Sequence, residues 1–407
     1  MRGGIGRGLA LTLGAVVQAA TSFGVQIVLM RLLVPEDFGR FALVLAGCSL
    51  VQTVLSWRLN VLIMRLPPGD QHSPAARLYQ AGLVWETLAA ALCTLVWLVL
   101  SGLISLYALV LVAALTLAQW GNQNIAFYER DMAYGRITLV ETGSQMVGHG
   151  VALVLVLAGA GPIALYIREL SAIAVRIAAF ARLGALLRPV LVWPRLNDLG
   201  QLWRESRAIW FEGVLEGSFA RLVILVAGTL CGLHGAGIFA QSQRLAILPH
   251  QFMSPVISRF AVNLFNRTQS HQHRLALLLR LAAMAALVLM VAVGVTLLWG
   301  TVLVPWVFGP KWSEAGTTLQ ALAGLILFLP LFDLFRSYAY AQNRVGGIVA
   351  ARLSQIASFA ISAFFVFLAG PADAVGVGYA LSAAYGVGFA VLLVGLFRRT
   401  GAGEAHA

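Results

Sequence analysis

The sequence predicts an all-α membrane protein with about twelve transmembrane helices, arranged as two pseudo-symmetric six-helix lobes. Composition is the first observation behind this fold class. The 407 residues are 60% hydrophobic and 11% charged, with a mean hydropathy of +0.85, whereas soluble chains carry about 25% charged residues. The second observation is that long apolar segments recur along the whole chain. The third observation is that the order of these apolar segments repeats in the two halves of the chain.

The apolar segments have the length of spanning helices, because about 20 helical residues cross the hydrocarbon core of a bilayer. The first six are residues 9–30, 40–57, 78–100, 103–127, 137–158 and 162–185. The second six are residues 208–231, 236–258, 276–298, 315–340, 346–368 and 374–396. The first segment is too long for the apolar region of a signal peptide, so we expect it to be the first helix.

The basic residues predict the orientation of the chain in the membrane. Most of the 28 Lys and Arg residues fall in or beside every second gap, together with the two termini. Only Arg31, Arg40 and Lys311 fall in the opposite gaps. Because loops on the cytoplasmic side carry the excess of Lys and Arg, both termini are expected in the cytoplasm. Basic residues spread over short loops favour contact with anionic lipid over nucleic-acid binding.

The longest gap divides the chain into an N-terminal lobe (1–187), a cytoplasmic interfacial linker (188–207) and a C-terminal lobe (208–407). The sequence FGRFA at 38–42 aligns with AGIFA at 236–240, and the same offset superposes the first two spans of each half. Six spans per half is an even number, so the two repeats run in the same direction about an axis along the membrane normal. This arrangement is typical of alternating-access transporters with a central cavity.

The stretch from Arg31 to Leu43 (RLLVPEDFGRFAL) is the most recognisable motif. Pro35 ends the first helix, and Glu36 and Asp37 favour the start of the next one. The stretch resembles the segment between the first two helices of polysaccharide (O-antigen-type, Wzx-like) flippases. This family belongs to the multidrug/oligosaccharidyl-lipid/polysaccharide exporter superfamily, which has the MATE-like fold. Residues 221–240 and 307–320 are similar to the same family.

The resemblance implies a flippase in the bacterial inner (cytoplasmic) membrane. Its substrate would be a polyprenyl-pyrophosphate-linked oligosaccharide, moved from the cytoplasmic to the outer leaflet by alternating access for surface polysaccharide biosynthesis. Membrane lipids are further expected partners, and so are a polysaccharide polymerase and chain-length proteins. No cofactor is implied, although coupling to H⁺ or Na⁺ is compatible with such a transporter.

Apart from the basic residues grouped with the gaps and the segment ends beside them, four arginines lie inside the apolar segments, where a charge costs roughly 2.5–3.5 kcal/mol to insert. They are Arg168, Arg176, Arg221 and Arg244. A guanidinium binds phosphate or carboxylate oxygens through two parallel hydrogen bonds, so these arginines are candidate contacts for an anionic head group. The alternative is ion pairing within the membrane, with Glu169 for the first two and with Glu212 or Glu216 for Arg221. For Arg244 the alternatives are a partner on another helix, or snorkelling of its charged end toward the membrane surface.

Amides and acids inside the spans complete the candidate site. Gln18 and Gln26 lie on one face of the first helix and suit sugar hydroxyls, or they join helices by hydrogen bonds. Glu216 and Asp333 are candidates for ion coupling, and pairing of Asp333 with Arg336 is the alternative role of that acid.

The sequence predicts no enzyme, because no catalytic or metal-binding motif is found. Cys48, Cys93 and Cys231 lie in apolar segments without metal-ligand spacing, and most of the seven His residues are assigned to loops. A cation-coupled multidrug exporter of the same fold is the main alternative, but it favours an acidic, aromatic cavity. A membrane-bound glycosyltransferase or polymerase is less favoured, because no long extracytoplasmic loop is evident. A purely structural membrane protein gives no reason for four arginines inside spans.

Overall fold

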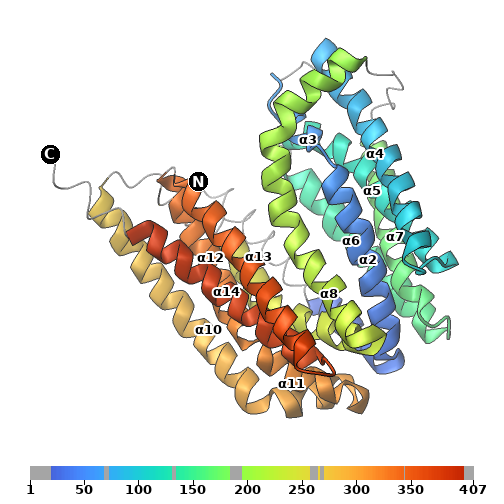
Figure 1. Cartoon of the computed structure of the whole chain (residues 1–407). Coiled ribbons are helices and arrows are strands. Elements are labelled where there is room, and N and C mark those ends of the chain that lie inside the picture. Colours follow the sequence, from blue (N-terminus) through green and yellow to red (C-terminus); the bar gives the residue numbers. More distant parts are fainter. Residues whose placement is uncertain are drawn as a thin grey trace, which may run out of the picture. The chain divides into compact units, whose positions relative to one another are not determined.

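The computed structural model describes residues 20–67, 73–130, 134–183, 195–256, 265, 270–342 and 344–397. Within these ranges the chain is helical and contains no strand. It divides into two compact units, residues 1–222 and 223–407 (Figure 1).

The first unit begins with a helix at Ala20–Leu32. The helices that follow are α2 (Pro35–Leu55), α3 (Leu59–Met64), α4 (Pro74–Leu100), α5 (Leu106–Arg130), α6 (Tyr134–Leu157) and α7 (Ile163–Arg182). The first part of α8 (Leu196–Val256) completes this unit, and the rest of α8 belongs to the second unit. A break inside α8 falls at Gly232, whose φ of 67° and ψ of −169° lie outside the helical region. Glycine adopts such a conformation readily because it has no Cβ.

The second unit continues with α10 (His271–Phe308), the short 3₁₀ helix η2 (Pro310–Trp312) and α11 (Ser313–Ala321). It ends with α12 (Ala323–Ala341), α13 (Val345–Leu368) and α14 (Ala374–Phe397). Of the residues described, eight helices are long and apolar enough to cross a membrane, and shorter apolar helices cover Ala20–Leu32 and Leu106–Asn122. Each of the twelve expected segments therefore overlaps a described helix. Helix α8 overlaps the seventh and the eighth segment, and α7 overlaps the sixth.

The start of α2 at Pro35 confirms that Glu36 and Asp37 lie in the first turn of a helix, as the sequence predicts. Pro35 occupies the first turn, where its missing N–H is not needed, and the backbone N–H of Val34 donates to Asp37 Oδ2 at 3.3 Å. The backbone N–H of Asp37 in turn donates to the carbonyl of Val34 at 3.1 Å, and the two bonds fix the beginning of the helix. The helix begins five residues before the segment that hydropathy alone marks at 40–57, because charged first-turn residues lower the local hydropathy without opposing helix formation.

Residues 196–207, which the sequence assigns to an interfacial linker, form the first turns of α8. The N–H of Arg195 donates to Asp198 Oδ2 at 2.8 Å, which caps the helix start. Leu202 is fully buried, and Trp210 Nε1 donates to the carbonyl of Val54 at 2.8 Å. This segment therefore packs as part of the first unit. The remaining linker residues up to 194 lie outside the described ranges.

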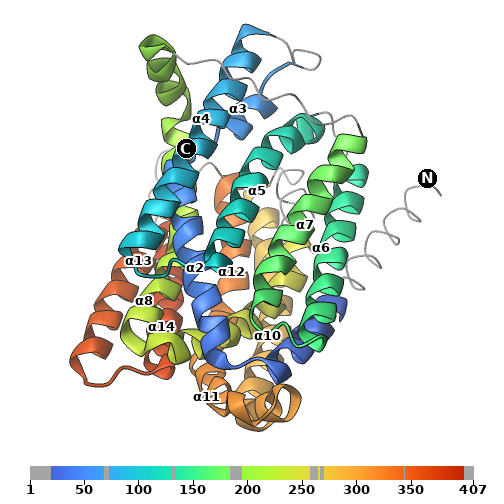
Figure 2. The ribbon, with the colours of Figure 1, turned by 90° about the vertical axis from the view of Figure 1, so that its right-hand side faces the viewer.

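In the first unit, α7 packs closely against α6 and α5, and Figure 2 shows α6 and α7 side by side. Gly148 on α6 makes this approach close, because a Cβ there would lie 2.8 Å from Ala172 Cβ and 2.9 Å from the carbonyl oxygen of Arg168. Small residues serve this purpose where helices meet in lipid. A cluster of buried hydrophobic side chains joins α3, α4, α5 and α8. Its buried members are Leu59, Leu62, Ile63, Tyr79, Leu83, Ala126 and Leu202.

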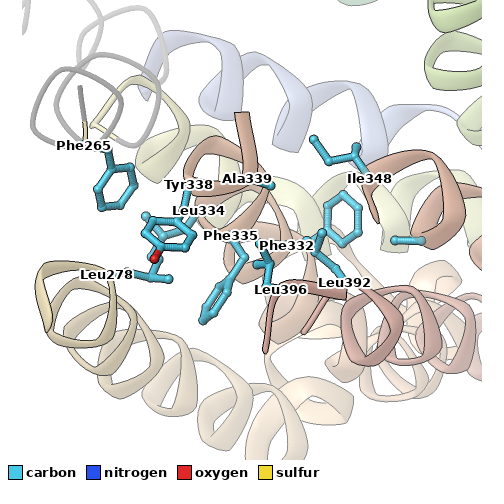
Figure 3. Packing of buried hydrophobic residues seen from close by; sticks show 11 residues of the cluster. Phe265, Leu278, Phe332, Leu334, Phe335, Tyr338, Ala339, Ile348, Leu392 and Leu396 are labelled. Carbon is cyan, nitrogen blue, oxygen red and sulfur yellow. The ribbon is translucent and has the colours of Figure 1, made fainter. Parts of the chain in front are cut away.

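In the second unit, α14 packs against α12 and α13, and α10 packs against α11 and α12. An apolar cluster at one end of this unit is drawn in Figure 3. Its members are Phe265, Leu278, Phe332, Leu334, Phe335, Tyr338, Ala339, Ile348, Ala351, Leu392 and Leu396. Only 6% of the residues in the most apolar stretch of α10 are buried. Such a stretch suits contact with lipid tails, which are as apolar as its side chains.

Candidate functional site

A polar cavity of about 300 Å³ lies inside the first unit. Its lining comes from α2, the break between α2 and α3, and helices α3, α4, α5 and α8. The lining residues are Ser49, Gln52, Thr53, Ser56, Arg58, Asn60, Leu83, Glu86, Leu115, Ala118, Gln119, Asn122 and Arg221. Most of these residues carry hydroxyl, amide or charged groups, although the helices that supply them are apolar. Polar groups gathered in this way inside a membrane protein indicate a functional site.

The break between α2 and α3 brings Arg58 to the cavity. Helix α2 ends at Leu55, and Arg58 adopts a left-handed conformation with φ 57° and ψ 34°. Among the described non-glycine residues it alone has a positive φ. For an L-residue this conformation costs roughly 1–2 kcal/mol. The strain is offset by surrounding contacts, one of which is a hydrogen bond from Arg58 NH2 to the carbonyl of Gly213 at 3.3 Å.

Glu86 on α4 is the carboxylate of this cavity, and its side chain is largely buried, since the residue is 9% exposed. Its Oε2 accepts a hydrogen bond from the backbone N–H of Trp57 at 3.1 Å, and its Oε1 accepts from Gln119 Nε2 at 2.9 Å. The side chain of Ser56 also hydrogen-bonds this carboxylate. Glu86 is not among the site residues predicted from the sequence, which were chosen mainly from the basic residues inside spans. The same signal, a charge within an apolar segment, would have found it.

Arg221 lies on the wall that α8 contributes to the cavity. Its NH1 donates to the carbonyl of Gly217 one turn earlier, and the positive charge of Arg58 lies near enough to act on it. Two like charges held close together raise the local attraction for an anion. Neither arginine has a described carboxylate as a direct ion-pair partner, and both donate hydrogen bonds to carbonyls of α8.

Gly213 and Gly217 allow the two arginines to lie along α8. A Cβ on Gly213 would come within 2.5 Å of Arg58 Nε, and a Cβ on Gly217 within 2.9 Å of Thr53 Cγ2. The two glycines are four residues apart, so they lie on one face of the helix. Such a G-x-x-x-G pair is often used for helix packing in membranes. In the first unit, Gly213 leaves space for the guanidinium of Arg58, and Gly217 leaves space for the side chain of Thr53.

Two buried amide atoms at the cavity have no hydrogen-bond partner. They are Gln52 Nε2, a donor, and Gln119 Oε1, an acceptor. A buried polar atom without a partner is costly, by about 1–3 kcal/mol. An unpaired donor and an unpaired acceptor lining one cavity are therefore suited to a ligand that both accepts and donates hydrogen bonds, such as a sugar.

Arg176 lies on α7 behind the cavity wall and not in the lining itself. Its NH2 donates to Asn122 Oδ1 at 3.1 Å and to the carbonyl of Ala118 at 3.4 Å, and both acceptors belong to lining residues. Arg176 therefore orients Asn122 from behind.

Arg168 lies apart from the cavity lining. It is 9% exposed, and its guanidinium contacts Glu169 Oε1 through NH2 at 2.6 Å and through Nε at 3.1 Å. Its Cζ also lies 5.8 Å from the centre of the Phe41 ring. The adjacent acid that the sequence offered as an alternative partner is thus the partner that the structure describes.

Of the other predicted site residues, Gln26 is not among the residues that line this cavity. Gln26 is buried in the first helix at 4% exposure, and Gln18 lies outside the described residues. The side chain of Glu216 is likewise outside what the structure describes. Arg244 is half-buried on the part of α8 that belongs to the second unit.

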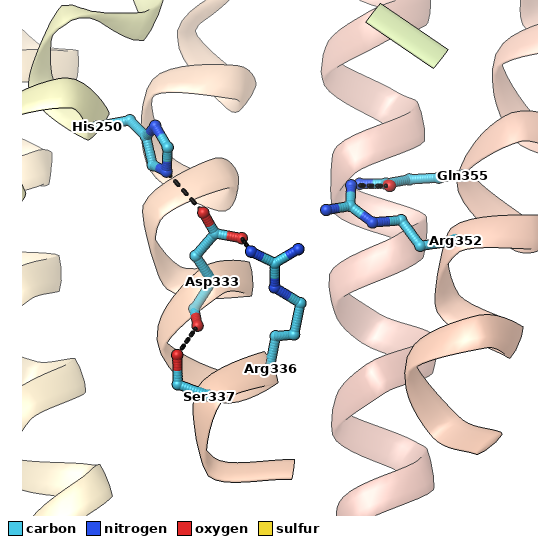
Figure 4. Close-up of polar contacts among 6 residues, drawn as sticks. All are labelled: His250, Asp333, Arg336, Ser337, Arg352 and Gln355. Carbon is cyan, nitrogen blue, oxygen red and sulfur yellow. Dashed lines mark hydrogen bonds and ion pairs between the residues drawn. The ribbon is translucent and has the colours of Figure 1, made fainter. Parts of the chain in front are cut away.

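Asp333 in the second unit forms the centre of a separate cluster, which Figure 4 shows. Its Oδ2 lies 2.7 Å from His250 Nε2, and its Oδ1 lies 3.1 Å from Arg336 NH2. Nearby on α13, Arg352 NH1 donates to Gln355 Oε1 at 2.9 Å, and its Cζ lies 4.5 Å from the centre of the Phe332 ring. The pair with Arg336 was one of the two roles expected for Asp333. His250 lies within α8, inside the apolar segment expected at 236–258.

Comparisons with known sequences give the same family as the N-terminal motif. A family model described as "Polysaccharide biosynthesis protein" matches residues 28–317. The chain is also 24% identical over 278 residues to the lipopolysaccharide biosynthesis protein WzxC of Escherichia coli (strain K12). That match covers 67% of this chain and 54% of WzxC, so the chain spans about half the length of this curated relative.

Solved structures show the same fold. The lipid II flippase MurJ in an inward closed conformation has a TM-score of 0.77 at 10% identity, over 95% of this chain and 87% of that chain. An inward-facing multidrug resistance MATE family transporter of the MOP superfamily has a TM-score of 0.71 at 15% identity, over 96% of both chains. The expected fold class is thereby confirmed. Since the family model matches well over half of the sequence, the chain is a multi-pass membrane protein that belongs to the family of polysaccharide biosynthesis proteins.

Proposed function

We propose that the protein is a flippase of the bacterial inner membrane, with both termini in the cytoplasm. It moves a polyprenyl-pyrophosphate-linked oligosaccharide from the cytoplasmic to the outer leaflet by alternating access. Membership of a polysaccharide biosynthesis family and the fold shared with MurJ and MATE transporters support this proposal. The protein is a transporter and not an enzyme, and it delivers cargo to a polysaccharide polymerase and chain-length proteins.

The observation that carries the proposal is the cavity of the first unit, where Arg58 and Arg221 lie among amides and hydroxyls. The head of a lipid-linked oligosaccharide is anionic and rich in hydroxyl groups. Guanidinium groups bind phosphate or carboxylate oxygens, and amides both donate to and accept from hydroxyls. The polyprenyl tail needs no such site, because it stays in the hydrocarbon core of the bilayer.

The test is export of surface polysaccharide in a strain that lacks the gene and is complemented with variants. Arg221→Ala and Arg58→Ala are expected to reduce export at least about tenfold, because each removes a charge-assisted contact. Arg204→Ala is the matched control. Arg204 lies on α8, is exposed, and donates through Nε to the carbonyl of Gly200 one turn earlier, as Arg221 does to Gly217. Normal export by both cavity variants at normal protein levels would contradict the proposal.

The drug-exporter alternative is separated by a second readout in the same strains. A multidrug exporter would lower susceptibility to cationic drugs, and its loss would raise it. The excess of arginine in the described cavity lining disfavours a cationic cargo. We therefore expect drug susceptibility to be independent of Arg221→Ala, whereas polysaccharide export depends on it.

We propose that transport is coupled to an ion and that Asp333 takes part, with Glu216 as the other candidate acid. Both carboxylate oxygens of Asp333 already contact cationic or titratable groups, His250 on one side and Arg336 on the other. A sodium ion would have to displace these contacts, whereas a proton can be exchanged through the His250 imidazole. Transport in proteoliposomes driven by a pH gradient, compared with a sodium gradient, tests this choice.

A further inference from the structure

Glu86 contributes a negative charge to a cavity that is otherwise suited to anions. In the described lining, Arg58 and Arg221 carry the positive charges and Glu86 carries the negative one. A carboxylate in an anion site weakens the attraction for an anion, so its presence requires a reason. Among the described residues, Glu86 forms no direct ion pair with either arginine within 4 Å. Its carboxylate accepts hydrogen bonds from Trp57, Gln119 and Ser56.

The contacts of Glu86 place Arg58 in the cavity. The hydrogen bond from the Trp57 N–H to Glu86 Oε2 holds the residue directly before Arg58, at the point where the backbone enters the left-handed conformation. On the other side, Gln119 fixes the second carboxylate oxygen from α5. The strained break and the guanidinium that follows it are thus positioned by the side chain of Glu86.

The same carboxylate sets the charge of the cavity. Two guanidinium groups without Glu86 would match a ligand group with two negative charges. With the Glu86 carboxyl ionised, the formal charges of the described lining sum to one positive charge. The free donor Gln52 Nε2 and the free acceptor Gln119 Oε1 add hydrogen bonds to hydroxyl groups.

We propose that Glu86 is the specificity-determining residue of this cavity, which therefore takes a sugar unit bearing a single negative charge, such as a sugar carboxylate. This inference rests on the proposed function, because it names the part of the cargo that enters the first unit. It assigns Glu86 two effects, the positioning of Arg58 and the selection of ligand charge.

Two substitutions separate these effects. Glu86→Gln keeps an oxygen that accepts from the Trp57 N–H. Its new amide can donate to Gln119 Oε1, which has no partner, once the Gln119 amide turns over. The variant therefore keeps the break and loses only the charge. Glu86→Ala loses the charge together with the hydrogen bonds to Trp57, Gln119 and Ser56. Glu141→Gln is the matched control, because Glu141 is an exposed acid on α6 that does not line the cavity.

The experiment measures binding of three soluble probes to the purified full-length protein in detergent. The probes are D-glucuronate, D-glucose 6-phosphate and D-glucose, which differ mainly in charge. Wild type and Glu141→Gln are expected to bind glucuronate most tightly. In Glu86→Gln, the ratio of the glucuronate and glucose 6-phosphate dissociation constants is expected to shift toward the phosphate by about tenfold. In Glu86→Ala, binding of both anions is expected to weaken, because Arg58 is no longer held.

The proposal is overturned if the ratio in Glu86→Gln equals that of wild type, or if Glu86→Gln and Glu86→Ala behave alike. It is also overturned if wild type binds no probe or prefers the phosphate. Unfolding midpoints in the same detergent show whether each variant is folded, and Glu86→Gln is expected to match wild type. None of these outcomes decides the proposed flippase function, because the export assay with Arg221→Ala tests that separately.

Discussion

The imidazole Nε2 of His250 lies 2.7 Å from Asp333 Oδ2, and this contact joins α8 to α12 within the second unit. The side chains of His250 and Asp333 are 18% and 14% exposed, so the pair is largely buried. Arg336 on α12 approaches the other carboxylate oxygen. One acid thus serves two basic side chains, and removal of the acid affects the cluster more than removal of either base.

We expect Asp333→Ala to lower the free energy of unfolding by about 3 kcal/mol, because it leaves buried basic groups without a counter-charge. His250→Ala is expected to cost less, since Arg336 still neutralises the carboxylate. Chemical unfolding of the purified protein in detergent measures both effects. The double variant should cost less than the sum of the single ones, as groups in contact are coupled. Strict additivity would show that the two side chains do not interact.

Variants of Arg168 and Glu169 test whether Arg168 only pairs with its neighbour or also contacts the cargo. Arg168→Gln leaves the Glu169 carboxylate without the guanidinium that approaches it to 2.6 Å, and we expect a loss of about 2 kcal/mol in stability and reduced export. Arg168→Gln combined with Glu169→Gln is expected to restore both stability and export. Should the double variant be stable and yet fail to export, Arg168 acts on the cargo and not only on its neighbour.

Gly217→Ala tests the narrow space between α8 and α2. The added methyl would lie 2.9 Å from Thr53 Cγ2 and 3.3 Å from Arg221 NH1, so we expect destabilisation of roughly 1–3 kcal/mol and reduced export. Thr53→Ser removes the Cγ2 methyl and keeps a hydroxyl for its 2.8 Å bond to the carbonyl of Ser49. The Gly217→Ala variant should therefore be rescued by Thr53→Ser. An unimproved double variant would locate the defect elsewhere.

Gln52→Met is expected to separate stability from activity. Gln52 Nε2 is a buried donor without a partner, so replacing the amide by an apolar chain of similar length should raise the unfolding free energy by about 1 kcal/mol. Export should fall, because the ligand loses a donor. Gln320→Met is the control, since Gln320 Nε2 donates to the carbonyl of Leu297 at 2.9 Å and its loss should destabilise the protein. Parallel loss of stability and export in Gln52→Met would contradict a ligand-binding role.

The long helices could be predicted from sequence because each is marked by apolar length or by a local cap, whereas the short helices α3 and η2 fall in gaps between the expected segments. Pro35 and Asp37 identify the start of α2 without tertiary information. The start of α8 was assigned to a linker because residues 196–207 are polar overall. What makes them helical is the capping carboxylate of Asp198 together with the burial of Leu202 against another part of the chain, and hydropathy reports neither.

The candidate site was predicted only where a charge interrupts an apolar segment. Arg221 was found in this way, and Glu86 carried the same signal. Arg58 could not be found, since it falls in a gap between apolar segments and reaches the cavity only through its left-handed backbone conformation. A partner distant in the sequence, such as His250 for Asp333, is likewise invisible without the fold, because 83 residues separate the two.

The hydrogen bonds that Trp57 and Gln119 donate to Glu86 have a consequence for the order in which the parts of the cavity are synthesised. Trp57 and Gln119 lie 29 and 33 residues from Glu86 along the chain, so both partners belong to the first few helices that leave the ribosome. The carboxylate can therefore be covered early during synthesis, which lowers the cost of keeping it in the bilayer. Arg221 arrives 135 residues after Glu86. The last charge of the cavity thus enters a membrane in which the hydrogen-bonded carboxylate is already in place, and the nascent protein need not hold both charges uncovered at once.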